Sequence, residues 1–144
     1  MTLFTIGFTQ STAENFFSRL KKAKVKILLD TRLNNQSQLA GFAKKDDLPY
    51  FLSKIAKIKY SHMPQLAPSK TILDDYRHKK ISWKVYEKRY LELIKKRNVK
   101  KLFKLSQLKD ACFLCSEAKP DHCHRRLLSD FFMQKFKKLK VVHL

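Results

Sequence analysis

The stretch Ser11–Asp30, STAENFFSRLKKAKVKILLD, contains the pattern on which the fold prediction rests. In its first part, Phe16, Phe17 and Leu20 recur at the spacing of one helical face, and lysines follow where cations suit the helix dipole. In its second part, residues 25–30 form the short apolar run of a buried strand. The stretch therefore predicts a helix that leads directly into a strand.

The start of this helix has a recognisable signal. Ser11 and Glu14 have the spacing of a capping box, in which each side chain accepts a hydrogen bond from a backbone amide near the other residue. We therefore expect the side chain of Ser11 to cap the helix.

The same alternation of strand and helix continues along the chain. Further strands are expected at residues 3–6, 58–62, 111–115 and 141–143, and further helices at residues 47–55, 71–78, 83–97, within 99–108, and at 122–138. This alternation is typical of a sheet whose strands are joined by helical crossovers. The sequence predicts an α/β fold: a single domain, residues 1–144, with a mostly parallel sheet of about five strands and helices on both faces.

The composition is that of a globular chain with a large positive charge. Its 144 residues include 32 Lys+Arg and 12 Asp+Glu, a net charge of +20, and the 44% of hydrophobic residues are enough to bury a core. No stretch approaches the roughly 20 apolar residues of a membrane span, and no secretory signal is expected. Three cysteines are too few for a disulfide scaffold, which favours a reducing, cytoplasmic compartment.

The charge also indicates the kind of partner. Pairs of adjacent lysines recur along the chain with few acidic residues near them, so the protein should attract nucleic acid or another polyanion. There is no Walker or dinucleotide-binding fingerprint, so no nucleotide cofactor, and no cofactor of another kind, is expected.

Functional residue types follow four of the predicted strands. They are Gly7 and Thr9 after the first strand, Asp30 and Arg32 after the second, His62 after the third, and Cys115, Glu117, Cys123, His124 and Arg125 after the fourth. In an open parallel sheet, ligands bind beyond the carboxyl ends of the strands. We therefore expect these residues to surround one polar cleft, with Gly7, Thr9 and His62 among the ligand contacts.

Two cysteines are candidate nucleophiles. Cys123 begins a predicted helix beside His124 and Arg125, where the dipole and the cation favour a thiolate, and Cys115 ends the preceding strand. The alternative is that both cysteines pack passively and that Glu117 forms a structural ion pair with Arg125.

The remaining polar residues suggest proton transfer and anion binding. Asp30, Glu117 or His124 can exchange protons with a ligand, and Arg32 and Arg125 can hold a phosphate or carboxylate. The alternative for Asp30 and Arg32 is an ion pair that only fastens the loop.

A zinc site is not expected. Cys112 and Cys115 are three residues apart on a predicted strand, so their side chains leave opposite faces of the sheet. A zinc ribbon would need this pair on a turn. Cys112 is expected in the core, and no metal is predicted.

Several spaced motifs together resemble a known family. They are Thr5-Ile-Gly7, Leu29-Asp30-x-Arg32, Ser37-x4-Phe42, Tyr60-x-His62-x-Pro-x-Leu66, Leu114-Cys115-x-Glu117 and Cys123-His124-Arg125. In this order they resemble the family catalogued as domain of unknown function 488, over nearly the whole chain. The resemblance implies a small α/β domain with a polar site built from these motifs. One position departs from the family pattern, because Phe8 stands where the family usually has a histidine.

Two functional hypotheses follow. In the first, the protein is an enzyme that acts on nucleic acid or on a phosphorylated nucleotide-like substrate in the polar cleft. In the second, it is a nucleic-acid-binding module without catalysis, or an adaptor for an acidic partner, and the same residues form a structural network under the loops.

Overall fold

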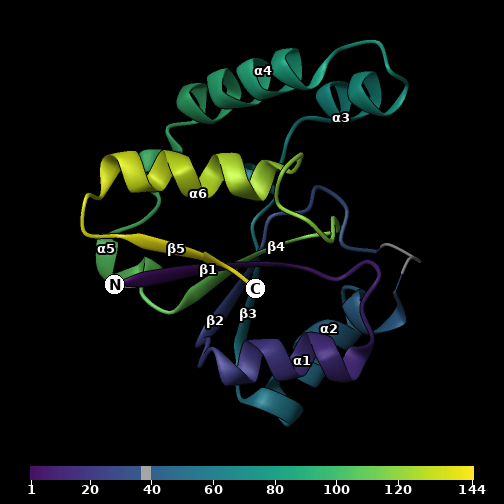
Figure 1. Ribbon diagram of the computed structural model, residues 1–144, viewed down its shortest axis with the longest axis vertical. Coiled ribbons are helices and arrows are strands. Elements are labelled where there is room, and N and C mark those ends of the chain that lie inside the picture. The colour runs from purple at the N-terminus through teal and green to yellow at the C-terminus, as the bar shows by residue number, and fades with distance from the viewer. Residues whose placement is uncertain (37–39) are drawn as a thin grey trace.

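Five parallel strands form the central sheet of the computed structural model, which describes residues 1–36 and 40–144 (Figure 1). The strands are β1 (Thr2–Gly7), β2 (Ile27–Asp30), β3 (Lys59–His62), β4 (Ala111–Cys115) and β5 (Lys140–His143). Their order across the sheet is β3-β2-β4-β1-β5. The predicted α/β fold is confirmed, and the sheet is entirely parallel.

Helices cover both faces of this sheet, as predicted (Figure 1). They are α1 (Ala13–Lys22), α2 (Asp47–Phe51), α3 (Lys70–Arg77), α4 (Trp83–Lys96), α5 (Leu105–Leu108) and α6 (His124–Lys135). The first two contribute to the apolar core on one face, and the other four contribute to the core on the opposite face. Figure 1 shows α6 between the sheet and α4. Within residues 1–36 and 40–144, no helix has both the length and the apolar character needed to cross a membrane.

Two helix starts differ from the sequence prediction. The side chain of Thr12, not that of Ser11, accepts the capping hydrogen bond, from the amide of Asn15 at 3.1 Å. Thr12 has extended backbone immediately before the first helical residue, whereas Ser11 lies one position too early. The last helix, α6, is shorter than the predicted 122–138, and Cys123 is its N-cap residue.

Side chains along β4 alternate between the two cores. Cys112 and Leu114 face the α1 side, where Cys112 is fully buried, as predicted. Phe113 faces the other side and packs on Phe132 of α6, with 6.0 Å between ring centroids. Cys115 lies two residues beyond Phe113, so it also faces the α6 side.

The connections diverge at the carboxyl ends of the central strands. The adjacent strands β1 and β4 lead into α1 and α6, which contribute to opposite cores. Such a switch in the direction of the crossovers leaves room for a ligand at that edge of an α/β sheet.

Candidate functional site

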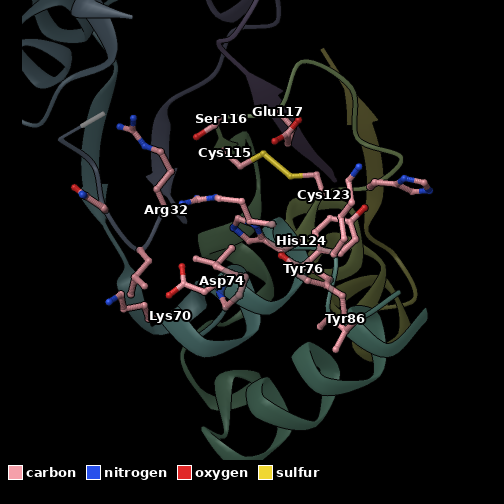
Figure 2. Close-up of a pocket in the computed structure, with 18 residues that line it drawn as sticks. Arg32, Lys70, Asp74, Tyr76, Tyr86, Cys115, Ser116, Glu117, Cys123 and His124 are labelled. Atoms are coloured by element: carbon pink, nitrogen blue, oxygen red, sulfur yellow. A yellow bond between two sulfur atoms is a disulfide. The ribbon is translucent and has the colours of Figure 1, made fainter. Parts of the chain in front are cut away.

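A cavity of about 1080 Å³ lies at this edge, with α3 and α4 on its other side (Figure 2). Its polar and aromatic lining includes Arg32 after β2, Lys70, Asp74, Tyr76 and Arg77 on α3, Lys79 after α3, Tyr86 on α4, and Cys115, Ser116, Glu117, His122, Cys123 and His124 between β4 and α6. Its volume is at the upper end of the range typical of ligand sites.

The cavity brings together part of the predicted site. Arg32, Cys115, Glu117, Cys123 and His124 contribute to its lining. The other five predicted residues, Gly7, Thr9, Asp30, His62 and Arg125, are not among its lining residues. Each of these five residues contacts a segment that leads to the cavity. They therefore support the cavity without lining it.

Arg32 and Asp30 form a buried ion pair. The Nε and Nη2 atoms of Arg32 donate to the Asp30 carboxylate at 2.9 and 2.7 Å, and Nη2 also donates to the Ala43 carbonyl at 2.7 Å. The Tyr60 hydroxyl donates to the same carboxylate at 2.6 Å. The guanidinium also makes a cation–π contact with Phe8, 5.0 Å from the centre of its ring. These contacts match the alternative in which the pair fastens the loop.

Two other predicted ligand contacts also hold loops. The Nε2 atom of His62 donates to the Arg32 carbonyl at 2.8 Å. The Thr9 hydroxyl donates to the Ser116 carbonyl at 2.7 Å. Both residues therefore fix the segments after β2 and β4, from which the cavity is built.

Gly7 is required by the close approach of another segment. A Cβ atom at this position would lie 1.6 Å from the Glu117 carbonyl oxygen and 2.8 Å from Nη1 of Arg125. The absence of a side chain allows the loop after β4 to cross the end of β1.

Arg125 lies fully buried beneath that loop. Its Nη1 donates to the Cys115 sulfur at 2.9 Å and to the Glu117 carbonyl, Nη2 donates to the Ala118 carbonyl at 3.2 Å, and Nε donates to the Thr5 hydroxyl at 3.3 Å. Within the part of the chain that the structure describes, no carboxylate oxygen lies within 4 Å of it. The alternative of a Glu117–Arg125 ion pair is therefore wrong, because the contact is to the main chain. Burial lowers the pKa of Arg125 to about 10.

His124 lines the cavity, and its hydrogen bonds define its protonation state. Its Nε2 lies 2.9 Å from both the hydroxyl and the carbonyl oxygen of Thr31. Since the Thr31 hydroxyl donates its own hydrogen to the Leu114 carbonyl at 2.8 Å, Nε2 must be the donor to Thr31. Burial lowers the pKa of His124 to about 4, so the ring is neutral at pH 7 and Nδ1 is free to accept a hydrogen bond.

Cys115 and Cys123 are joined as a disulfide at the cavity (Figure 2). This pairing differs from the prediction of two unlinked cysteines, either reactive or passively packed. The eight-residue separation hides the pairing, because β4 and α6 bring the two ends of the intervening loop together. Cys112 remains free, and burial raises the pKa of its thiol.

Sequence reasoning missed the wall of the cavity that α3 and α4 provide. This wall carries Lys70, Arg77 and the aromatic residues Tyr76 and Tyr86. A signal was present, since this segment follows β3 and must start at the same edge of the sheet as the other motifs. The predicted site includes no residue of this segment beyond His62.

One motif of the family resemblance is only partly described. Ser37 lies outside the residues that the structure describes. Phe42, the other end of that motif, packs on Phe16 and Phe17, with ring centroids 5.3 and 5.8 Å apart. It is therefore a packing residue on the α1 side of the sheet.

No metal centre is evident. Among residues 1–36 and 40–144, no group of three or more His, Cys, Asp or Glu side chains is placed to hold an ion.

Comparison with known proteins identifies the family. No curated protein and no solved structure gives a significant match to the chain. A family model, described as domain of unknown function DUF488, matches residues 12–132 of the 144 residues. This match includes the loop after β2, the α3–α4 wall and the Cys-His-Arg segment. The chain belongs to the DUF488 family.

Proposed function

We propose that the cavity binds one nucleotide unit of a nucleic acid strand or of a smaller phosphorylated ligand, and that the basic surface holds the neighbouring phosphates. The observation that carries this proposal is the combination, in one cavity, of exposed cations, an aromatic wall and the N-terminus of α6.

The cations at the cavity are available for phosphate. Lys70, Arg77 and Lys79 are exposed along its lining, where Asp74 and Glu117 are the acidic residues. Within residues 1–36 and 40–144, only four Lys or Arg side chains contact a carboxylate, although the chain has 32. Most of the +20 charge is therefore free to attract a polyanion.

The aromatic wall can support a base. Tyr76 and Tyr86 line the cavity, and their ring centroids are 5.1 Å apart. Trp83 stacks on Tyr86 at 4.8 Å and on His122 at 5.0 Å, which extends the aromatic surface to the loop before α6. Stacking of a base on such a surface contributes about 1–3 kcal/mol.

The N-terminus of α6 favours an anion in the same cavity. The helix has 12 residues, and its N-cap residue, Cys123, makes no side-chain capping hydrogen bond. The amides of His124 and Arg125 have no acceptor within the helix and can donate to phosphate oxygens, with the helix dipole adding to the attraction. The Arg126 amide already donates to the Cys123 carbonyl at 3.1 Å.

Two acceptors complete the lining. The Glu117 carboxylate and Nδ1 of His124 can accept hydrogen bonds from the amino groups of a base or the hydroxyls of a sugar. They are also the groups that would take up a proton if the bound ligand reacts.

A binding experiment with paired variants tests the proposal. A fluorescent single-stranded oligonucleotide is titrated with the protein at ~50 and ~200 mM salt, and we expect binding to weaken steeply with salt. The double variant Arg77→Ala/Lys79→Ala removes two charges at the cavity, and the control Lys137→Ala/Lys138→Ala removes two exposed charges beyond the other end of α6.

We expect the cavity variant to lose about tenfold in affinity and the control about twofold, because only the first removes contacts to a bound nucleotide. Equal losses would place the strand elsewhere on the surface. Mass spectrometry of the oligonucleotide after incubation distinguishes an enzyme, which alters it, from a binding module, which leaves it intact.

A further inference from the structure

Among residues 1–36 and 40–144, no carboxylate pairs with the buried cation that lies beside both sulfur atoms of the cavity. Nη1 of Arg125 is 2.9 Å from the sulfur of Cys115 and 3.9 Å from that of Cys123. Its other acceptors are a hydroxyl and two backbone carbonyls, all of them neutral. A buried charge without a counter-ion is unfavourable, so this position strongly favours an anion next to Arg125.

The reduced form of the cysteine pair can supply that anion. A Cys115 thiolate would accept a charge-assisted hydrogen bond from Arg125, whose Nη1 already donates to this sulfur. Cys123 is the N-cap residue of α6, where the positive end of the helix dipole also favours a thiolate.

We propose that Cys115 and Cys123 form a redox-active pair, in which Cys115 is the thiolate that reacts with a peroxide, Cys123 resolves the product, and Arg125 is the counter-ion. This inference does not rest on the proposed function, since the two sulfurs react without a nucleotide ligand. Both residues line the cavity, which gives a small oxidant a route to them.

The chemistry balances with hydrogen peroxide as the oxidant. The Cys115 thiolate attacks one peroxide oxygen, an S–O bond forms, the O–O bond breaks, and hydroxide leaves and is protonated to water. The Cys123 thiolate then attacks the Cys115 sulfur of the sulfenic acid, forming the disulfide and releasing the second oxygen as water. Two thiols and one peroxide give one disulfide and two waters, and an external dithiol returns the pair to the reduced form.

The position of Arg125 makes this pair suited to repeated cycles. Oxidation removes the negative charge beside the guanidinium and leaves it without a counter-ion, so reduction by a dithiol restores a favourable contact. The oxidation state therefore also changes the charge of the cavity.

The third cysteine is an internal control. Cys112 is fully buried on the opposite face of the sheet, among apolar side chains of the α1 core. It should not react while the protein is folded.

The experiment uses reduced, desalted protein treated with one equivalent of hydrogen peroxide and then with N-ethylmaleimide. Digestion by a protease that cuts after glutamate separates the two cysteines at Glu117, so a Cys115–Cys123 disulfide appears as two linked peptides in mass spectrometry. We expect this linkage, with Cys112 alkylated only after unfolding.

Variants then assign the roles. In Cys123→Ser, Cys115 should accumulate as a sulfenic acid that dimedone traps, whereas Cys112→Ala should form the disulfide like the wild type. Arg125→Gln should slow peroxide oxidation at pH 7 about tenfold, because the fraction of Cys115 present as thiolate should fall about tenfold. Arg125→Lys, which retains the charge, should slow it less.

The wild-type result alone can overturn the proposal, even if the Arg125 variants fail to fold. Folded protein that forms no linkage with peroxide, or that is labelled at Cys115 no faster than at Cys112, would show that the pair is a passive structural contact.

Discussion

Two buried arginines near the ends of central strands are held in opposite ways. Arg32, after β2, has the Asp30 carboxylate at 2.7 Å, and hydrogen bonds from Arg32 to the Ala43 carbonyl and from Tyr60 to Asp30 hold the pair. Arg125, on α6 beside the end of β4, has neutral acceptors and a cysteine sulfur. Burial of an arginine therefore does not by itself indicate a function. Nη1 of Arg32 is buried without a hydrogen-bond partner among the described residues, but this guanidinium already has a carboxylate counter-ion. The Arg125 centre has no carboxylate within 4 Å in the described part of the chain, so it favours an anion.

Removal of the Asp30 charge should have the largest effect. Asp30→Asn leaves Arg32 buried without a counter-ion, so we expect a loss of about 3–5 kcal/mol in the free energy of unfolding, measured by urea denaturation. The control is Asp130→Asn, which breaks the partly exposed contact with Arg126 at 3.4 Å and should cost less than about 1 kcal/mol. Similar losses in the two variants would mean that the buried Asp30–Arg32 pair stabilises the fold no more than a partly exposed one.

Acid should destabilise the Arg125 side of the molecule through His124. The pKa of folded His124 is lowered to about 4 by burial, whereas an exposed histidine titrates near pH ~6.5. Between these values the unfolded chain binds a proton that the folded chain does not, so stability is lost as the pH falls, by up to about 3 kcal/mol.

The variant His124→Gln isolates this effect, because glutamine can still donate to Thr31 but does not titrate. Urea denaturation at several pH values should show the stability advantage of the wild type over the variant shrinking from pH 7 to 4. A constant difference would mean that His124 is not buried in its neutral form.

Two glycines give a matched test of the loop over Arg125. Gly7→Ala places a methyl group against the Glu117 carbonyl, so the loop must shift, and we expect a cost of about 1–3 kcal/mol. A Cβ at Gly41 would meet no atom of the described residues within 4 Å, and Gly41→Ala should change stability by less than about 0.5 kcal/mol. Thermal denaturation of both variants measures the difference, and equal stability would mean that the loop is not packed on β1.

The last pair of variants removes one hydroxyl group beside each of the two buried arginines. Tyr60→Phe removes a donor to the Asp30 carboxylate, a hydrogen bond to a charged group worth about 1.5–3 kcal/mol. Burial, together with Asp30, raises the pKa of Tyr60, so this hydroxyl remains a donor. Thr5→Val removes one of several acceptors of Arg125, together with the 2.6 Å hydrogen bond between the Thr5 hydroxyl and Nδ1 of His143, and should cost about 1 kcal/mol. Both losses are measured by chemical denaturation. A larger loss for Thr5→Val than for Tyr60→Phe would contradict the stronger hydrogen bonding around the Asp30–Arg32 pair.

Local patterns were enough to predict the fold. The apolar runs that end at Asp30 and Cys115 became adjacent buried strands, and the helical spacing after Thr12 became α1. The side-chain directions beyond the strand ends could not be predicted in the same way. Whether Arg32 turns to Asp30 or into the cavity depends on Tyr60 and Ala43, which reach it only in the folded chain.

The opposite wall of the cavity depends still more on tertiary packing. Tyr76 and Tyr86 have the spacing of ordinary core residues in an amphipathic helix, and nothing local indicates that they reach the loop before α6. The pairing of Cys115 with Cys123 likewise depends on the loop that Arg125 and Gly7 hold in place.

The central position of β4 has a consequence for the order of folding. β1 and β2 are synthesised early but are not neighbours, because β4, which begins at Ala111, lies between them and pairs with both. Until that strand is made, the sheet remains in two parts with unpaired apolar edges, a state that folds slowly and is prone to aggregation. The site therefore forms only when the chain is nearly complete, so a ribosome-bound fragment that ends before β4 should have neither the cysteine pair nor the cavity.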